Sequence, residues 1–333
     1  MDWVKNFNSK KRMKEFNRNT LNRNFKLRKV AIVLGFYDGY KFINMQLQSI
    51  FDQTHQNFII FVTDDNSKDK FSLEKLNINE RNKKKIRIGF RNKNIGYAQN
   101  FLNALVSING NFDYYAFSDQ DDIWDPEKLE KAINALEEYP DNQANLYGSR
   151  TELIGRSEDK KLGKSIKFNK SPSFQNALTQ NIFGGNTMVF NRNAFDLICS
   201  SNINQKIISH DWWCYQIISG AGGNVFYDKN IYLKYRQHNN NLIGSNISLK
   251  DKWLRFCKVA NGNFKIQNDH NLKAIFDNQN LLIKRNQIIL TNFIKARKSS
   301  FLKRIFYFAK SGVYRQTLIG NIALFIGIVL KKV

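Results

Sequence analysis

Residues 30–37 of this 333-residue chain read VAIVLGFY, a continuous apolar run. A run without alternation is typical of a strand that is buried on both faces of a sheet. Three further strand candidates follow: FIIFVT from Phe58, the shorter and alternating IRIGF from Ile86, and DYYAFS from Asp113. The four starts are 28, 28 and 27 residues apart, the length of one strand plus one crossover helix. This spacing predicts βαβ units and a mostly parallel sheet flanked by helices, an α/β fold.

Helical periodicity follows the first predicted strand, over residues 43–51, and the third, over residues 98–105. The second half of the chain is less regular. Asp125 and Pro126 predict the start of a helix after the fourth strand. Residues 155–173 are polar and basic, which predicts a loop. Further expected elements are a short strand over 187–190, a helix over 211–219, and two strands over 224–227 and 231–235.

Acidic residues follow three of the four predicted strands. Asp38 comes after the first, Asp64-Asp65-Asn66-Ser67 after the second, and Asp119-Gln120-Asp121-Asp122 after the fourth. Ligands of parallel sheets bind beyond the carboxyl ends of the strands, so we expect these groups at one edge. Their mutual repulsion requires a cation or hydrogen-bond donors of a ligand. The Gly-rich signatures GxGxxG after the first strand and GxxxxGK[ST] are absent from the sequence, which argues against dinucleotide-binding and P-loop proteins.

The Asp119-Gln120-Asp121 triplet is the first candidate site. Alternate residues of an extended chain project to the same side, so both carboxylates can face one ligand. Such oxygens suit Mg²⁺ or Mn²⁺ carrying a diphosphate. The alternative is a capped surface turn. Asp64 and Asp65 can accept from a base N–H or a ribose hydroxyl, or simply form an Asx turn.

Two further candidates lie in the second half. In His210-Asp211-Trp212-Trp213 the carboxylate sits between apolar rings, a setting that favours general-base use, and the indoles could stack on a sugar. The alternative is an amphipathic helix with buried aromatic residues. In Arg236-Gln237-His238 the arginine could pair with a diphosphate and the histidine with a metal or phosphate, or the histidine could be a plain surface residue.

The net charge of +24 is concentrated at the two ends of the chain. Residues 1–29 carry +8, residues 250–333 carry +14, and the stretch between them is close to neutral. Basic ends suit an anionic membrane surface at least as well as nucleic acid, and lysines kept for solubility are the alternative. The apolar run over 318–330, bracketed by Arg315 and Lys331, is too short to span a bilayer, so it predicts an interfacial or buried helix.

In order, the motifs VAIVLGFYDG, VTDDNS, NKNIGYAQNF, FSDQDDIW, FGGNTMVFNR, SHDWW and YRQHNNNLIG resemble those of family 2 inverting glycosyltransferases with a GT-A fold, particularly bacterial rhamnosyltransferases. The resemblance covers about residues 28–246. The turn after the first strand departs from the family pattern, and the carboxyl-terminal RQH differs from the QxxRW of processive synthases.

The resemblance implies roles for individual residues. Asp119 and Asp121 match the metal- and diphosphate-binding DxD motif, with His238 as a further metal contact and Mn²⁺ or Mg²⁺ as cofactor. Asp211 matches the general base. Arg236 is expected at the diphosphate. Residues expected to contact the donor nucleotide are Tyr37, Asp38, Asp64, Asp65, Asn94 and Asp119. Residues expected on the acceptor side are Gly185, Asn186, Trp212 and Trp213.

We therefore expect a basic segment over 1–27, a catalytic domain over 28–246 with donor and acceptor halves (28–125 and 126–246), and a basic helical region over 247–333. The expected reaction transfers a sugar, L-rhamnose from dTDP-rhamnose in the first place, to a saccharide or lipid-linked saccharide in cell-surface polysaccharide synthesis. The expected location is cytoplasmic, at the inner face of the cell membrane, with no nucleic-acid partner.

Three alternatives remain open at this point. The first is a UDP-hexose-dependent transferase of the same fold. A nucleotidyltransferase is disfavoured because the loop GFYDG, after the first strand, carries no cation before Lys41. A non-enzymatic basic binding protein would leave acids at three strand ends without a purpose.

Overall fold

The structure, a computed structural model, describes residues 27–238 and 263–333. Residues 1–26 of the predicted basic segment and the motif residues that follow His238 lie outside the described residues. Nine strands of the described chain form one sheet in the order β3-β2-β1-β4-β8-β6-β9-β5, with β7 paired to β6. The strands are β1 (Val30–Phe36), β2 (Phe58–Asp64), β3 (Ile86–Phe90), β4 (Tyr114–Ser118), β5 (Ile123–Trp124), β6 (Asn145–Ile154), β7 (Lys161–Lys164), β8 (Val189–Asn191) and β9 (Asn224–Arg236).

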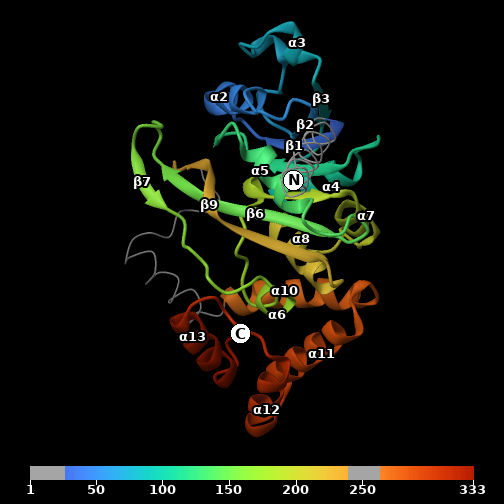
Figure 1. Cartoon of the computed structure of the whole chain (residues 1–333). Helices are drawn as coiled ribbons and strands as arrows, with labels where there is room; N and C mark the ends of the chain where they lie inside the picture. Colours follow the sequence, from blue (N-terminus) through green and yellow to red (C-terminus); the bar gives the residue numbers. More distant parts are fainter. Residues whose placement is uncertain (1–26, 239–262) are drawn as a thin grey trace, which may run out of the picture.

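The first four strands are parallel, as the sequence predicts. β1 pairs with β2 and β4, and β2 pairs with β3, all in parallel. β8 is antiparallel to both β4 and β6, while β9 runs parallel to β6. Strands from both predicted halves, 28–125 and 126–246, thus belong to one sheet (Figure 1). The boundary between those halves stays a prediction.

Helices cover both faces of this sheet. The helices are α2 (Tyr40–Phe51), α3 (Glu80–Lys83), α4 (Tyr97–Val106), α5 (Lys128–Leu136), α6 (Phe174–Ala177), α7 (Arg192–Ser200), α8 (His210–Gly220), α10 (Asn263–Asp277), α11 (Lys284–Lys298), α12 (Phe301–Ser311) and α13 (Leu318–Val329). Short 3₁₀ turns lie at Leu73–Lys75, Gly185–Thr187 and Gln279–Leu281.

β1 shows why the sheet is covered on both sides. Ile32 and Leu34 pack in a core shared with α2 and α5, whereas Ala31 and Val33 pack in a core shared with α4, α7 and α8. Side chains alternate along a strand, so a run that is apolar at every position must be buried on both faces.

The second half departs from the sequence prediction at two elements. The strands expected over 224–227 and 231–235 form one strand, β9, whose pairing with β6 shifts register near Arg150. A bulge absorbs the polar Asp228–Asn230 stretch that separates the two apolar runs. The loop expected over 155–173 contains β7, an exposed edge strand without an apolar pattern.

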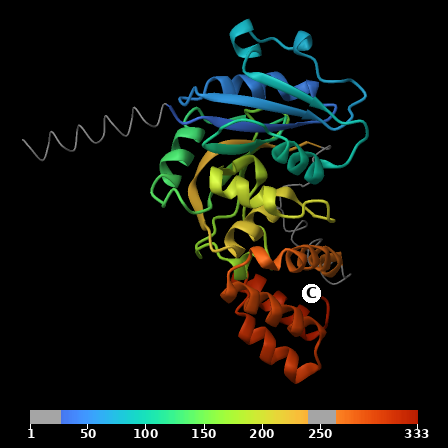
Figure 2. The ribbon, with the colours of Figure 1, turned by 90° about the vertical axis from the view of Figure 1, so that its right-hand side faces the viewer.

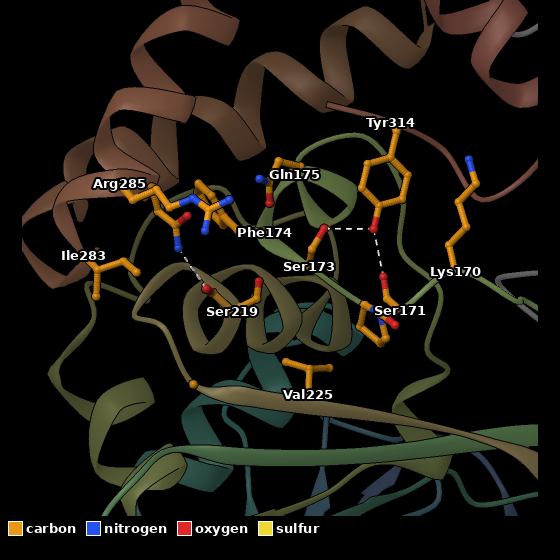
Figure 3. A pocket seen from close by; sticks show the side chains of 13 residues that line it. Lys170, Ser171, Ser173, Phe174, Gln175, Ser219, Val225, Ile283, Arg285 and Tyr314 are labelled. Carbon is orange, nitrogen blue, oxygen red and sulfur yellow. Dashed lines mark hydrogen bonds between the residues drawn. The ribbon is translucent and has the colours of Figure 1, made fainter. Parts of the chain in front are cut away.

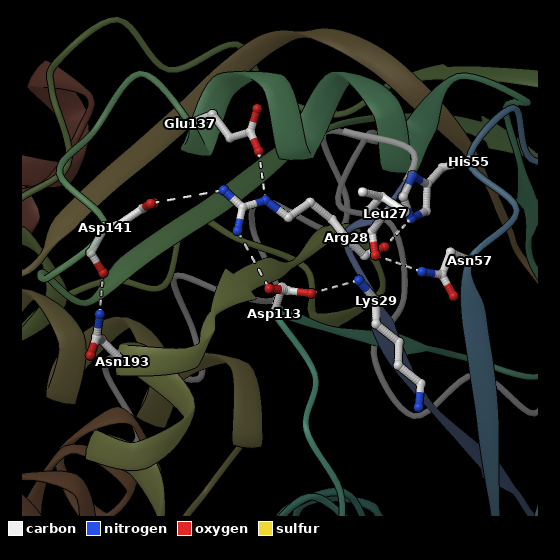
Figure 4. Close-up of polar contacts among 9 residues, drawn as sticks. All are labelled: Leu27, Arg28, Lys29, His55, Asn57, Asp113, Glu137, Asp141 and Asn193. Carbon is white, nitrogen blue, oxygen red and sulfur yellow. Dashed lines mark hydrogen bonds and ion pairs between the residues drawn. The ribbon is translucent and has the colours of Figure 1, made fainter. Parts of the chain in front are cut away.

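An ionic cluster fixes the amino end of β1 (Figure 4). The Arg28 guanidinium pairs with Glu137 at 3.1 Å, with Asp113 at 3.4 Å and with Asp141 at 3.8 Å. The other carboxylate oxygen of Asp113 accepts from the Lys29 N–H at 2.7 Å. The cluster joins β1 to the segments before β4 and after α5. It lies at the strand end opposite to the acidic residues.

The C-terminal helices form a lobe against one end of α8 (Figure 2). The amide of Asn286 donates to the carbonyl oxygens of Ser219 and Gly220 at 3.1 and 2.9 Å. Leu290 and Phe293 of α11 belong to the same core as Ile217 and Ile218 of α8. The C-terminal helices over 263–333 therefore pack on the domain that contains the sheet.

Candidate active site

The strand register brings the predicted acidic residues to one edge of the sheet. Phe36 at the end of β1 lies beside Asp64 of β2, and Leu34 lies beside Ser118 of β4. Asp38, Asp64 and Asp119 therefore leave the sheet at the same edge. Ligands of parallel sheets bind at such an edge, because the loops that follow the strands meet there.

Asp119 and Asp121 share this edge with Asp211, which comes from the start of α8. Burial, together with the negative charges of Asp121 and Asp211, raises the pKa of Asp119 to about 8. Burial also raises the pKa of Asp121, and His238 opposes this shift through its Nε2, 2.7 Å from the Asp121 carboxylate. Two carboxylates of the loop after β4 and a third from the start of α8 thus interact electrostatically at this edge.

Asp122, the last residue of the acidic run, is buried and hydrogen-bonds to two other segments of the protein. Its carboxylate is fully buried and accepts from the Asn186 side chain at 2.5 Å and from the Arg236 backbone N–H at 3.1 Å. Burial and the charges of Asp121 and Asp119 raise its pKa well above the ordinary value. Asp122 therefore ties the acidic loop to the Gly185–Asn186 turn and to the end of β9. The sequence did not single it out.

Arg236, which we expected at the diphosphate, lies behind the acidic loop. Its side chain is 1% exposed, and its guanidinium donates to the carbonyl oxygens of Asp121 at 2.8 Å and Arg156 at 2.6 Å. It also stacks over the Phe42 ring at 4.7 Å. A direct contact with a diphosphate would require exchange of these bonds, whereas its positive charge already acts on Asp121.

Asp64 and Asp65 bind backbone amides of the loops around the expected nucleotide position. Asp64 accepts from Ser67 and Phe71 at 2.7 and 2.8 Å, which is the Asx-turn alternative. Asp65 accepts from the N–H groups of Ile95 and Gly96 at 2.9 and 3.0 Å. Burial raises the pKa of Asp65. Both carboxylates shape the edge of the site.

The remaining residues expected at the nucleotide lie on these same loops. Asn94 is exposed, and its side-chain oxygen accepts from the Gly96 N–H at 3.1 Å. Tyr37 is exposed at the end of β1, with its backbone N–H and C=O bound to the Gln120 amide at 2.8 and 3.1 Å. Asp38 adopts a left-handed φ of 45°, and its carboxylate accepts from the Lys68 N–H at 2.9 Å. Gln120 thereby joins the loops after β1 and β4.

Asp211 is held at the amino end of α8 by three donors. Its Oδ1 accepts from the Ser209 hydroxyl and from the Trp212 N–H at 2.6 Å, and its Oδ2 accepts from the Gly185 N–H at 3.1 Å. A carboxylate has about four lone-pair sites, so Oδ2 keeps one for a further proton. The arrangement fixes the orientation of a potential general base.

The two tryptophans beside Asp211 are buried. The Trp212 indole N–H donates to the Ala177 carbonyl at 2.7 Å, and that of Trp213 donates to the Ser201 hydroxyl at 3.2 Å. Trp213 belongs to the core that α8 shares with α4. This placement matches the alternative of buried aromatic residues on a helix.

A separate open cleft of about 610 Å³ lies at the other end of α8 (Figure 3). Its lining includes Ser173, Ser219, Arg285 and Tyr314. Ser219 follows Asp211 by eight residues, which corresponds to about 12 Å along a helix axis. The cleft is therefore distinct from the acidic edge.

The sequence model for glycosyl transferase family 2 matches residues 31–198, from β1 into α7. The chain belongs to glycosyl transferase family 2. The match contains all three acidic strand ends and the Gly185–Asn186 turn. It confirms the predicted enzyme class and, together with the observed sheet, the predicted GT-A fold class.

Several family members are similar over a longer part of the chain. The dTDP-rhamnosyl transferase RfbG of Shigella flexneri is 31% identical over 240 residues, which cover 68% of this chain and 78% of the relative. An uncharacterized glycosyltransferase of Haemophilus influenzae is 28% identical over 174 residues, covering 50% and 52% of the two chains. The predicted resemblance to rhamnosyltransferases is confirmed.

Two solved structures of low sequence identity are also similar. Residues 1–349 of S. aureus TarS, in complex with UDP-GlcNAc, are 14% identical with a TM-score of 0.49, covering 86% of this glycosyltransferase and 93% of that chain. The mannosyltransferase PcManGT of Pyrobaculum calidifontis, in complex with GDP-Man and Mn2+, is 13% identical with a TM-score of 0.49, covering 91% and 80%.

The acidic edge of this glycosyltransferase has carboxylates that fit a divalent cation whose remaining ligands come from a bound phosphate and water. Within residues 27–238 and 263–333, no three His, Cys, Asp or Glu side chains are arranged to hold a metal by themselves. Mg²⁺ is usually bound by one or two carboxylates plus substrate phosphates and water. Asp119 and Asp121 provide such carboxylates, and a bound cation would relieve their mutual repulsion.

Gly185→Ala should displace Asp211, the predicted general base, while leaving the overall fold intact. A Cβ at this position would lie 2.3 Å from the Nε2 of His210, a ring packed against Phe101 at 4.2 Å and Phe117 at 4.7 Å. Overpacking costs about 1–3 kcal/mol. Relief of this clash moves the Gly185 N–H away from Asp211, so turnover should fall by more than tenfold, roughly the scale of one misplaced catalytic contact.

Melting temperature and turnover measured on the same preparations check this expectation. Gly89→Ala is the matched control, because a Cβ there meets only one backbone oxygen at 4.0 Å. Wild-type turnover in Gly185→Ala would show that the Gly185–Asp211 contact is dispensable.

Proposed function

We propose that this chain is an inverting glycosyltransferase that moves L-rhamnose from dTDP-rhamnose to a hydroxyl of a saccharide or lipid-linked saccharide in cell-surface polysaccharide synthesis. The observation that carries the proposal is the convergence of Asp119, Asp121 and Asp211 at the carboxyl edge of the sheet. The choice of donor is supported by the 31% identity to a dTDP-rhamnosyl transferase over two thirds of the chain. The proposed place of action is the cytoplasmic face of the cell membrane.

In this proposal the donor lies along the loops after β1, β2 and β4. The nucleotide contacts Tyr37, Asp38 and Asn94, and the loops are shaped by Asp64 and Asp65. Its diphosphate lies at Asp119 and Asp121, which together with His238 would hold Mn²⁺ or Mg²⁺. When bound, such a cation neutralises part of the charge that develops on the leaving diphosphate. The acceptor approaches past Gly185, Asn186 and Trp212.

The proposed reaction is a single displacement. Asp211 Oδ2 takes the proton of the acceptor hydroxyl while that oxygen forms a bond to the anomeric carbon. The bond from this carbon to the diphosphate oxygen breaks, and its electron pair leaves with the nucleoside diphosphate. Attack opposite the leaving group inverts the anomeric configuration. The Ser209, Trp212 and Gly185 donors keep the carboxylate oriented throughout.

Thermal-shift measurements with a donor panel test the nucleotide and the sugar. Ligand at 100 times its Kd adds about 2.7 kcal/mol, which corresponds to roughly 5–10 °C for a domain of this size. We expect dTDP-rhamnose to give this shift with manganese present and a smaller one in excess chelator. A larger rise in melting temperature with UDP-hexoses would show that the donor is a UDP-hexose and not dTDP-rhamnose. No shift with any nucleotide-sugar would overturn the donor site.

A further inference from the structure

The last helix of the chain, α13, has one buried face and one apolar exposed face. Leu324 and Ile328 are buried in the core, and Gly327 faces Val333 closely. The opposite stripe is exposed: Leu318 at 77%, Ile319 at 81% and Ile322 at 51%, followed by Phe325, Ile326 and Leu330. The sequence left a choice between an interfacial helix and a buried one, and α13 has a face of each kind.

The apolar stripe continues onto α12. Leu302 is 78% exposed, and Phe301 and Phe306 are each more than half exposed. The rings of Phe308 and Phe325, 6.1 Å apart, join the two helices. Soluble monomers rarely expose a contiguous apolar surface of this kind, and such a surface marks an interaction site.

The charged side chains of the segment that carries this apolar surface all have one sign. Residues 278–333 contain eleven Lys and Arg and no Asp or Glu. Lys303 and Lys310 lie exposed on α12, and Lys331 and Lys332 follow α13. Apolar side chains surrounded only by cations match the boundary between anionic headgroups and acyl chains. A second copy of the chain would bring two such cationic segments together, which disfavours self-association through this face.

We propose that α12 and α13 dock this protein on an anionic lipid bilayer, with the α13 stripe inserted at the level of the acyl boundary and the lysines on the lipid phosphates. The docked helices lie in the plane of the interface. α13 has 12 residues, about 18 Å of helix, against the ~30 Å of a hydrocarbon core. No helix in the described ranges has the length and apolar character needed to cross a membrane. The docking surface is independent of the proposed reaction.

Vesicle flotation with the full chain tests the proposal. Wild type should float with phosphatidylglycerol vesicles, much less with phosphatidylcholine vesicles, and less at high salt because surface charge is screened. The combined Leu318→Ser, Ile319→Ser and Ile322→Ser variant should bind phosphatidylglycerol at least about tenfold more weakly. Met45→Ser is the matched control, because Met45 is an exposed apolar residue on α2, 41% exposed, and it should float like wild type.

Point variants are preferable to deletion because the inner face of α13 is part of the core. The three replaced side chains are exposed, so the melting temperature should stay within about 2 °C of wild type. If that variant unfolds, Lys331→Gln with Lys332→Gln takes its place and should lower binding to phosphatidylglycerol alone. Dye-detected nucleotide binding by the same variants reports on the donor site separately.

Three results would overturn the proposal. The first is wild-type flotation of the folded α13 variant. The second is equal flotation of wild type with both lipids, or with neither. The third is a wild-type dimer in light scattering that the α13 substitutions convert to a monomer, which would make the apolar face a contact between copies of the chain.

Discussion

Asp211→Asn protein should turn over its substrates ~10²–10⁴-fold more slowly than wild type, because asparagine cannot accept a proton at neutral pH. Donor affinity should be nearly unchanged, since Asp211 acts on the acceptor. The loss should appear in kcat and in kcat/KM alike, as expected for an interaction that matters in the transition state. Asparagine also keeps only one of the two oxygens, so at least one of the three donors around Asp211 loses its acceptor, at a cost of about 1–3 kcal/mol in stability.

Donor affinity, melting temperature and turnover, all measured on this one variant, distinguish a catalytic role of Asp211 from a purely structural one. A purely structural Asp211 also lowers the melting temperature, but it gives weaker donor binding and keeps the turnover per folded molecule, so donor affinity and turnover decide between the two roles. Asp196→Asn is the matched control, because that carboxylate is exposed and pairs with Arg192 on the same helix, α7. Wild-type turnover by well-folded Asp211→Asn protein would remove the assignment of the base.

Asp121→Ala should abolish manganese-dependent donor binding and lower transfer by at least about 10²-fold, since the leaving diphosphate loses its electrostatic partner. Asp121→Asn keeps the size of the side chain and a bond to His238 but loses the charge. It should therefore bind donor as weakly as the alanine variant. Calorimetry with the nucleoside diphosphate, with manganese and with chelator, measures the effect.

Asp125→Asn is the control for both Asp121 variants. Asp125 is exposed four residues later and accepts from the Glu127 N–H at 3.0 Å, outside the acidic cluster. Full activity of Asp121→Ala, or of wild type in excess chelator, would contradict the metal role. If the Asp121→Ala protein instead shows no cooperative unfolding transition, Asp121 supports the fold, as Asp122 does.

The strands β1, β2 and β4 could be predicted from the sequence because burial on both faces leaves little room for polar residues. β1 has no polar residue at any position, and the four predicted strands, β3 included, begin and end within one residue of their observed bounds. β6 carries Ser149 and Thr151 on buried positions, so its pattern does not stand out. All four residues of β7 are exposed at the edge of the sheet, which leaves no periodic apolar signal.

The convergence of the carboxylates was also predictable, because parallel strands end at one edge. The sequence did not show which of the carboxylates hold the loops in place through hydrogen bonds. Asp65 binds amides at Ile95 and Gly96, and Asp122 binds Asn186, partners that only the folded chain brings together. For the same reason Arg236 looked like a diphosphate ligand in the sequence, although its guanidinium is bound to backbone carbonyls behind the loop.

The anomeric configuration of the product tests the central claim most directly. Wild-type protein would be incubated with dTDP-rhamnose, manganese and a panel of saccharides carrying a short lipid aglycone, and the new glycosidic bond followed by NMR. A single displacement by Asp211-assisted attack predicts a product whose anomeric configuration is opposite to that of the donor, with release of one nucleoside diphosphate per bond formed. A product with the donor's configuration, or consumption of nucleotide-sugar without any glycosidic bond across the panel, would contradict it.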